Sequence, residues 1–184
     1  MVGVSPEHTS VPAWPTDPGE IDPAGQSFQV LGSGRDGVRV ARAWLAQIAR
    51  TGRPVLSHVD GHTAPERSVA VAALGASLAR ARVGVRVMIA GPELVALDAI
   101  AAARAAGAID AELRVWVSDR ALKRVYCPHC RTFTVARVQV ADTFACGGCA
   151  RTLVVYHHLS RRHGAYLGFL ADVQADAGDR GASG

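Results

Sequence analysis

Between residues 27 and 120, short runs of apolar and β-branched residues alternate with segments in which apolar positions recur every three or four residues. The runs predict four strands, at 28–31, 54–59, 85–90 and 112–117. The periodic segments predict three helices, one containing positions 38–48, one over 65–82 and one from Pro92 to before Gly107. This alternation is typical of an α/β fold with a small Rossmann-like parallel sheet, which binds ligands at the carboxyl ends of its strands.

Both ends of the chain lack this periodicity. Residues 1–26 contain five of the nine prolines, and the last stretch is mostly Ala, Gly and Asp. Such segments bury too little apolar surface to fold alone. The expected organisation is a disordered proline-rich arm over 1–26, a Rossmann-like domain over 27–120, a second module over 121–170 and a flexible tail over 171–184.

The composition is that of a globular protein, with 49% hydrophobic and 20% charged residues. No apolar segment follows a basic start, and no run of about 18 apolar residues occurs, so neither secretion nor a membrane span is expected. We therefore expect a cytoplasmic protein. In a reducing compartment, four cysteines arranged as two close pairs favour metal binding over disulfides.

Positive charge is concentrated in the second module. Residues 120–170 hold eight Lys or Arg and one acidic residue, Asp142, whereas the net charge of the whole chain is only +4. A basic module suggests a negatively charged partner, either an acidic protein surface or nucleic acid.

The first candidate site is the pattern Gly32-x-Gly34-x-x-Gly37, which lies between a predicted strand and a predicted helix. In a dinucleotide fingerprint these glycines let the backbone approach the pyrophosphate, and an acidic residue after the next strand, here Asp60, binds the ribose. NAD(P)H is the cofactor that this pattern implies. The alternative is a tight turn into a helix.

The loop at Gly91-Pro92 extends the same candidate site. Residues 89–93 and 107–112 resemble the Gly-Pro-Glu loop and final strand of the pyridine-nucleotide domain in ferredoxin reductase-like flavoproteins. The resemblance implies that Gly91 and Pro92 border a nucleotide. No nucleophile, paired carboxylates or His–Asp pair converges on these loops, so no catalytic residue is assigned.

The most specific motif is a pair of C-x2-C sequences, Cys127/Cys130 and Cys146/Cys149, separated by fifteen residues. Two such knuckles bring four thiolates around one ion, and this spacing is typical of a zinc ribbon. Iron of the rubredoxin type and a redox-active dithiol pair remain alternatives, although rubredoxin knuckles usually carry Gly where this chain has Arg131 and Ala150. With four protein ligands the ion has no open position, so we expect a structural role.

A polar and aromatic segment follows the second knuckle. Residues 156–169 contain three His, two Arg and two Tyr, residue types that anchor interfaces or contact nucleic acids. The candidate partner-binding residues are His157, His158, Ser160, Arg161, Arg162 and Tyr166. The alternative is that the aromatic rings cover the ribbon while the charges are solvated.

The knuckle Tyr126-Cys127-Pro128-His129-Cys130, followed by Ser160-Arg161-Arg162 soon after the second knuckle, resembles the C-terminal part of the DmmA-like family. Its members are small subunits of bacterial haem-dependent dimethylamine monooxygenase. The resemblance covers residues 86–170 well and the preceding region poorly.

This resemblance implies a multi-component enzyme that demethylates dimethylamine to methylamine and formaldehyde with a reduced nicotinamide cofactor and oxygen. Haem then belongs to one partner subunit, and flavin with an iron–sulfur cluster to another. The present chain would be an accessory, zinc-stabilised subunit that docks on them. Two other classes stay open: a nucleic-acid-binding zinc ribbon and a free-standing NAD(P)-binding protein.

Overall fold

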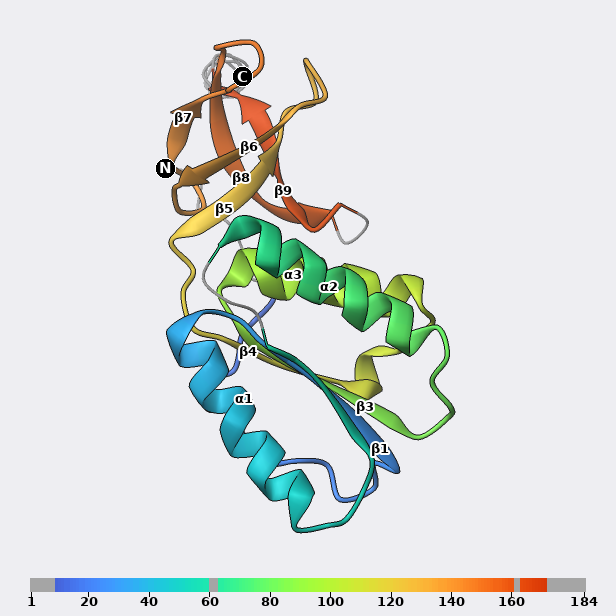
Figure 1. The fold of residues 1–184 in the computed structure, drawn as a ribbon. Coiled ribbons are helices and arrows are strands. Elements are labelled where there is room, and N and C mark those ends of the chain that lie inside the picture. The colour runs from blue at the N-terminus through green and yellow to red at the C-terminus, as the bar shows by residue number, and fades with distance from the viewer. Residues whose placement is uncertain (1–8, 60–62, 161–162, 172–184) are drawn as a thin grey trace, which may run out of the picture. The chain divides into compact units, whose positions relative to one another are not determined.

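The computed structural model describes residues 9–59, 63–160 and 163–171, and these divide into two compact units. Residues 13–120 form the first, which we call the α/β unit. Residues 9–12 and the described residues after 120 form the second, which we call the C-terminal module. Figure 1 shows both as ribbons.

The α/β unit contains one sheet of four parallel strands in the order β2-β1-β3-β4. The strands are β1 (Ser27–Gly32), β2 (Val55–Val59), β3 (Val85–Gly91) and β4 (Leu113–Val117). The helices between them are α1 (Gly34–Ala49), α2 (Ala64–Leu78) and α3 (Glu93–Ala105), and the short 3-10 helix η2 (Asp110–Glu112) precedes β4. The predicted α/β class with a parallel sheet is therefore confirmed.

Helices cover the sheet on both faces. Helix α1 packs on one face through Trp44 and Ile48, against Phe28 and Val30 of β1. Helices α2 and α3 pack on the other, where Leu31 lies (Figure 1). Successive residues of a strand point to opposite faces, so a strand covered on both sides must be apolar throughout. This is why β1 and β3 carry nearly continuous apolar runs.

The segment over 13–26 differs from the disordered arm that the sequence predicted. The indole N–H of Trp44 donates to Gly19 O at 2.9 Å, and that of Trp116 donates to Thr16 O at 3.1 Å. Trp14 donates in turn to the buried Glu93 at 2.7 Å. Prolines keep this segment extended but leave its carbonyls free to accept, and tryptophan N–H groups need such partners when covered.

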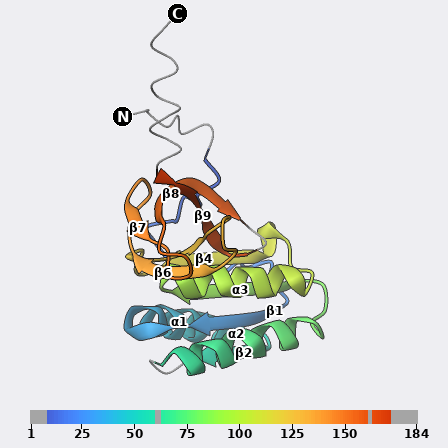
Figure 2. The ribbon, with the colours of Figure 1, turned by 90° about the horizontal axis from the view of Figure 1, so that it is seen from above.

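The C-terminal module contains a five-stranded sheet in the order β6-β5-β9-β8-β7. The strands are β5 (Leu122–Tyr126), β6 (Phe133–Arg137), β7 (Thr143–Ala145), β8 (Thr152–Ser160) and β9 (Ala165–Leu170). All neighbours pair antiparallel except β5 and β9, which are parallel. Strands β8 and β9, orange to red in Figure 2, pair on both sides of an irregularity between Val155 and Leu159.

The irregularity in β8 receives a second segment of the chain. Ser10 N and Thr9 Oγ1 donate to the carbonyl of His157 at 3.4 and 2.9 Å, and Leu159 N donates to Ser10 Oγ at 2.7 Å. Residues 9 and 10 therefore bind backbone groups of β8 in the stretch where register with β9 is interrupted. Part of the segment that contains the predicted partner-binding residues is thus hydrogen-bonded to the chain's own N-terminal residues.

Candidate metal centre

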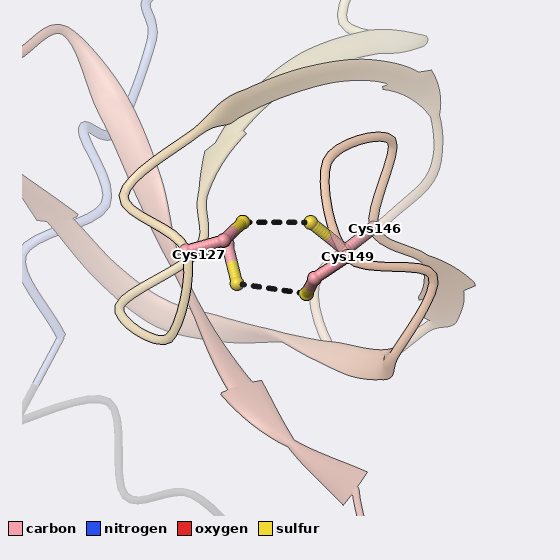
Figure 3. Close-up of side chains that lie close together, drawn as sticks. Cys127, Cys146 and Cys149 are labelled. Atoms are coloured by element: carbon pink, nitrogen blue, oxygen red, sulfur yellow. Dashed lines mark hydrogen bonds between the residues drawn. The ribbon is translucent and has the colours of Figure 1, made fainter.

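The four cysteine side chains converge on one point of the C-terminal module. Cys127 Sγ lies 3.9 Å from Cys149 Sγ, and Cys130 Sγ lies 3.6 Å from Cys146 Sγ. Figure 3 shows the sulfur atoms, in yellow, facing one another in pairs. All four sulfur atoms lie within 4.8 Å of one another. A disulfide bond measures only about 2.05 Å, so these are free thiols in contact. The predicted convergence of the four cysteines, which suits one metal ion, is confirmed.

The two knuckles share one backbone design. In each knuckle, the residue that follows the second cysteine donates its backbone N–H to the carbonyl of the first cysteine. The first cysteine donates its own backbone N–H to the carbonyl of the residue five positions later in the chain. The first pair of bonds is Arg131 N to Cys127 O at 2.8 Å and Ala150 N to Cys146 O at 2.9 Å. The second pair is Cys127 N to Thr132 O at 3.0 Å and Cys146 N to Arg151 O at 2.9 Å. The same backbone hydrogen bonds therefore close both knuckles.

Arg131 and Ala150 close these knuckles in the left-handed region, with φ of 59° and 56°. Glycine is the residue that adopts this conformation without cost, and other residues lose about 1–2 kcal/mol there. The sequence argument had used the absence of glycine at both positions against a rubredoxin-like iron. Since both residues adopt the glycine conformation anyway, that argument does not discriminate between the metals.

Further hydrogen bonds stabilise the second knuckle and tie it to β6. Gly148 N donates to Cys146 Sγ at 3.4 Å, and Gly147 N donates to Thr134 Oγ1 at 3.0 Å. A side chain at Gly148 would meet Thr132 Oγ1 at 2.8 Å and Cys130 Sγ at 3.0 Å. Because the knuckles approach this closely, only glycine fits between them.

The surroundings separate the thiol pKa values. Burial acts to raise the pKa of Cys146, but hydrogen bonds from the backbone N–H groups of Gly148 and Cys149 outweigh it and lower this pKa to about 6. For Cys149 the N–H of Arg151 acts in the opposite direction, yet desolvation and the neighbouring thiols raise the pKa to about 11. Metal binding requires deprotonated thiols, so a bound cation would displace the remaining protons.

The cluster lies at the core of its module. Cys127 is 0% exposed and Cys146 is 3% exposed, and both pack with Leu153 of β8. Phe144 and Leu170 cover this group. An ion held here has four protein ligands and no open position, so its chemistry is to hold strands together rather than to activate water.

The structure also brings together most of the predicted nucleotide site. Gly32 ends β1, Gly34 and Gly37 lie in the first turn of α1, and Gly91 ends β3 with Pro92 as N-cap of α3. Strands β1 and β3 are neighbours, and Ser33 N donates to Ala90 O at 2.8 Å. Asp60 lies outside the described residues.

Three of these glycines have packing reasons, and a side chain at Gly91 would meet Ser33 Cβ at 2.9 Å. A side chain at Gly32 would meet Ala41 Cβ at 2.6 Å, and one at Gly37 would meet the carbonyl oxygen of Ala90 at 2.4 Å. Gly34 differs, because its neighbours leave room but its φ is +67°. Next to it, the hydroxyl of Ser33 is buried without a hydrogen-bond partner among the described residues.

The predicted partner-binding residues that the structure describes differ in exposure. His157, His158 and Ser160 are half-buried on β8, and Arg161 and Arg162 lie outside the described residues. Tyr166 is only 1% exposed and its ring lies 4.8 Å from Lys123 Nζ. Contrary to the prediction, Tyr166 is a core residue, because β9 turns this ring inward beneath β5.

The sequence argument missed a different aromatic group. The rings of Tyr126, Phe133 and His163 lie within 5.7 Å of one another, centroid to centroid. The signal that could have found part of it is the alternation of Phe133, Val135 and Arg137, which places all three on one face of β6.

Comparison with known proteins identifies a family that matches the C-terminal part and a relative that matches most of the chain. Residues 124–169 match a family described as dimethylamine monooxygenase subunit DmmA-like, C-terminal domain. A heme-dependent oxidative N-demethylase delta subunit from Ectopseudomonas mendocina (strain ymp) is 32% identical over 163 residues, which cover 89% of either chain. No solved structure matches the chain. Within the described residues, no helix is long and apolar enough to cross a membrane.

Proposed function

This chain belongs to the DmmA-like family of dimethylamine monooxygenase subunits, and from that premise we propose that it is an accessory, non-haem subunit of a multi-component oxidative N-demethylase. It docks on a haem-bearing subunit and on a flavin and iron–sulfur reductase subunit. Its contribution is assembly of the complex. The observation that carries this proposal is the match to a delta subunit over 89% of both chains.

The closed geometry of the cysteine cluster fits an accessory role. Among the described residues, the four cysteines are the one group of His, Cys, Asp and Glu side chains placed to hold a metal ion. That group is closed, so it offers no position to oxygen or to an amine. The oxidative chemistry is therefore assigned to the partner subunits, and the substrate class is a small secondary amine.

Zinc is the ion that we propose for the cysteine cluster, which makes the C-terminal module a zinc ribbon. With Zn–S bonds of about 2.3 Å, a tetrahedral site separates its sulfur atoms by about 3.8 Å. The sulfur separations of 3.6 and 3.9 Å match this spacing. Zinc has no redox chemistry and suits a bracing role. Iron uses the same ligands, and metal analysis with the absorption spectrum of the purified chain separates the two.

A second candidate function is binding of NAD(P)H by the α/β unit, which we interpret as Rossmann-like. The left-handed Gly34 at the start of α1 and the unpartnered hydroxyl of Ser33 favour it. Here the N-terminus of a 16-residue helix would face the pyrophosphate. The experiment is titration with NADPH of the chain and of Gly34→Ala. Gly52→Ala is the matched control, because Gly52 has φ of +66° at the other end of α1, with open space around it.

The accessory role is tested by leaving the chain out. The isolated chain should contain zinc and show no demethylase activity. Co-expression of the haem and reductase subunits with this chain should give an active complex, and the same subunits without it should give little active complex. Recovery of a fully active enzyme in the absence of this chain would contradict the proposal.

A further inference from the structure

One face of the β5–β6 hairpin has no role in the site described above. Cross-strand register places three residue pairs on it, Leu122 with Arg137, Arg124 with Val135, and Tyr126 with Phe133. The alternate residues Lys123 and Val125 point inward and are buried. We call the six outward residues the β5–β6 face.

This face is apolar for a surface. Leu122, Phe133 and Val135 are 40%, 42% and 51% exposed. The ring of His163, from the turn between β8 and β9, stacks on Tyr126 with 5.7 Å between centroids and 12° between planes, and it also contacts Phe133. Single exposed apolar residues need no explanation, but a contiguous group of aliphatic and aromatic side chains marks an interaction site.

The outer edge of β6 is a second feature of this region. Strand β6 ends the order of its sheet, and no described strand pairs with its outer side. It contains neither lysine nor proline, the residues that commonly protect an edge from pairing. Its backbone N–H and C=O groups therefore offer a template for an added strand, which is one of the recurring modes of peptide recognition.

The positive charge of the β5–β6 face and its module indicates the charge of the strand that would bind there. On this face Arg124 lies between Leu122 and Tyr126 along β5, and Arg137 lies opposite Leu122 at the end of β6. Residues 121–170 hold seven Lys or Arg against Asp142 alone. The carboxylate of Asp142 accepts a hydrogen bond from Gln139 N within its own turn. The complementary partner is acidic. A strand edge beside Leu122 and Val135 fits a polypeptide better than a nucleic acid, because a nucleic acid lacks the peptide N–H and C=O groups that continue a β-sheet.

We propose that the β5–β6 face binds an extended acidic segment of another subunit of the N-demethylase complex, which adds as a strand to the edge of β6. Its apolar side chains pack on Phe133 and Val135, and its carboxylates approach Arg124 and Arg137. For the identity of the partner this inference rests on the proposed function. The metal site shapes the face, because the first knuckle connects Tyr126 at the end of β5 to Phe133 at the start of β6.

The test uses the full chain, tagged and co-expressed with the haem and reductase subunits. Val135→Asp and Arg137→Glu each place a negative charge on the face. Val69→Asp is the matched control, because Val69 is 68% exposed on α2. We expect at least a tenfold loss of co-purified subunit for the two face variants and none for the control. Zinc content and circular dichroism must stay unchanged, which shows that the module is folded.

The outcomes separate the inference from the function on which it rests. If the unaltered chain retains its partner subunits and both face variants retain them equally, the face is not the docking site, and the accessory role stands. If the unaltered chain retains none of them, the accessory role and this partner both fail. If the face variants lose salt-dependent binding to DNA while keeping the subunits, the face is a nucleic-acid site and the inference is overturned.

Discussion

Cys130 and Cys146 place their sulfur atoms 3.6 Å apart, although they belong to knuckles that follow different strands, β5 and β7. These strands are not neighbours, because β9 and β8 lie between them in the sheet. An ion at the cysteines would therefore link the loop after β5 to the loop after β7, across the two strands that separate them. This is why we regard the metal as the brace of the whole C-terminal module.

Removal of the metal should unfold this module and leave the α/β unit folded. Structural zinc sites supply roughly 10–16 kcal/mol of apparent binding free energy. We expect this to exceed the free energy of unfolding of a module of this size, so the module should not stay folded without the metal. After chelation, amide hydrogen exchange should show loss of protection in β5, β8 and β9, whereas β1 and β3 keep theirs. Added zinc should restore the protection, and equal loss in both units would contradict this account.

Gly148→Ala should weaken the metal site, whereas Gly147→Ala should change it little. A methyl group at Gly148 meets Thr132 and Cys130 Sγ at 3.0 Å or less, but at Gly147 it meets only Thr134 Oγ1 at 3.4 Å. Overpacking of this kind costs about 1–3 kcal/mol. Competition with a chromophoric chelator should show roughly a tenfold or greater loss of zinc affinity for Gly148→Ala. Equal affinities for the two variants would be the contrary result.

The parallel sheet and the cysteine cluster were predictable because their signals are local. Continuous apolar runs such as 85–90 distinguish strands covered on both faces, and two C-x2-C knuckles leave little choice for where the thiols meet. The family resemblance was also readable from the knuckle sequence.

The remaining features depend on tertiary contacts that a local pattern does not contain. Prolines in the N-terminal arm indicated disorder, but the indoles of Trp44 and Trp116, remote in sequence, bind its carbonyls. Tyr166 looked like a docking residue because its neighbours are polar, and pairing of β9 with β5 and β8 buries it. The aromatic group at Tyr126 was missed because its third ring, His163, comes from the turn between β8 and β9.

Trp14→Phe should destabilise the α/β unit more than Trp116→Phe. The indole of Trp14 bonds to a carboxylate that is 2% exposed, Glu93, whereas the indole of Trp116 bonds to the exposed carbonyl of Thr16. Hydrogen bonds to charged groups contribute about 1.5–3 kcal/mol, and ordinary ones about 0.5–1.5 kcal/mol. Urea unfolding at pH 7.5 measures the difference, and a larger loss for Trp116→Phe would refute the assignment.

Mild acid should destabilise the α/β unit through His58. Burial lowers the pKa of His58 below its usual 6.5, so the unfolded chain binds the proton more tightly than the folded one. The contribution of neutral His58 is complete above about pH 6.5 and is lost as the pH falls toward the folded pKa.

His58→Gln isolates this effect. Gln29 and Ser77 are the hydrogen-bonding neighbours of the imidazole, and glutamine offers a neutral polar group in its place. The free energy of unfolding of the α/β unit should fall less between pH 7.5 and 5.5 in the variant than in the unaltered chain. Identical slopes would show that His58 does not contribute.

The central claim is that a zinc-braced chain is a constituent of the N-demethylase complex. Native mass spectrometry of the active complex, purified by a tag on the haem subunit, tests both parts in one spectrum. This chain should be present, and it should carry the added mass of one zinc ion with its cysteines reduced. An active complex that lacks this chain, or a chain that carries two disulfides and no metal, would contradict it.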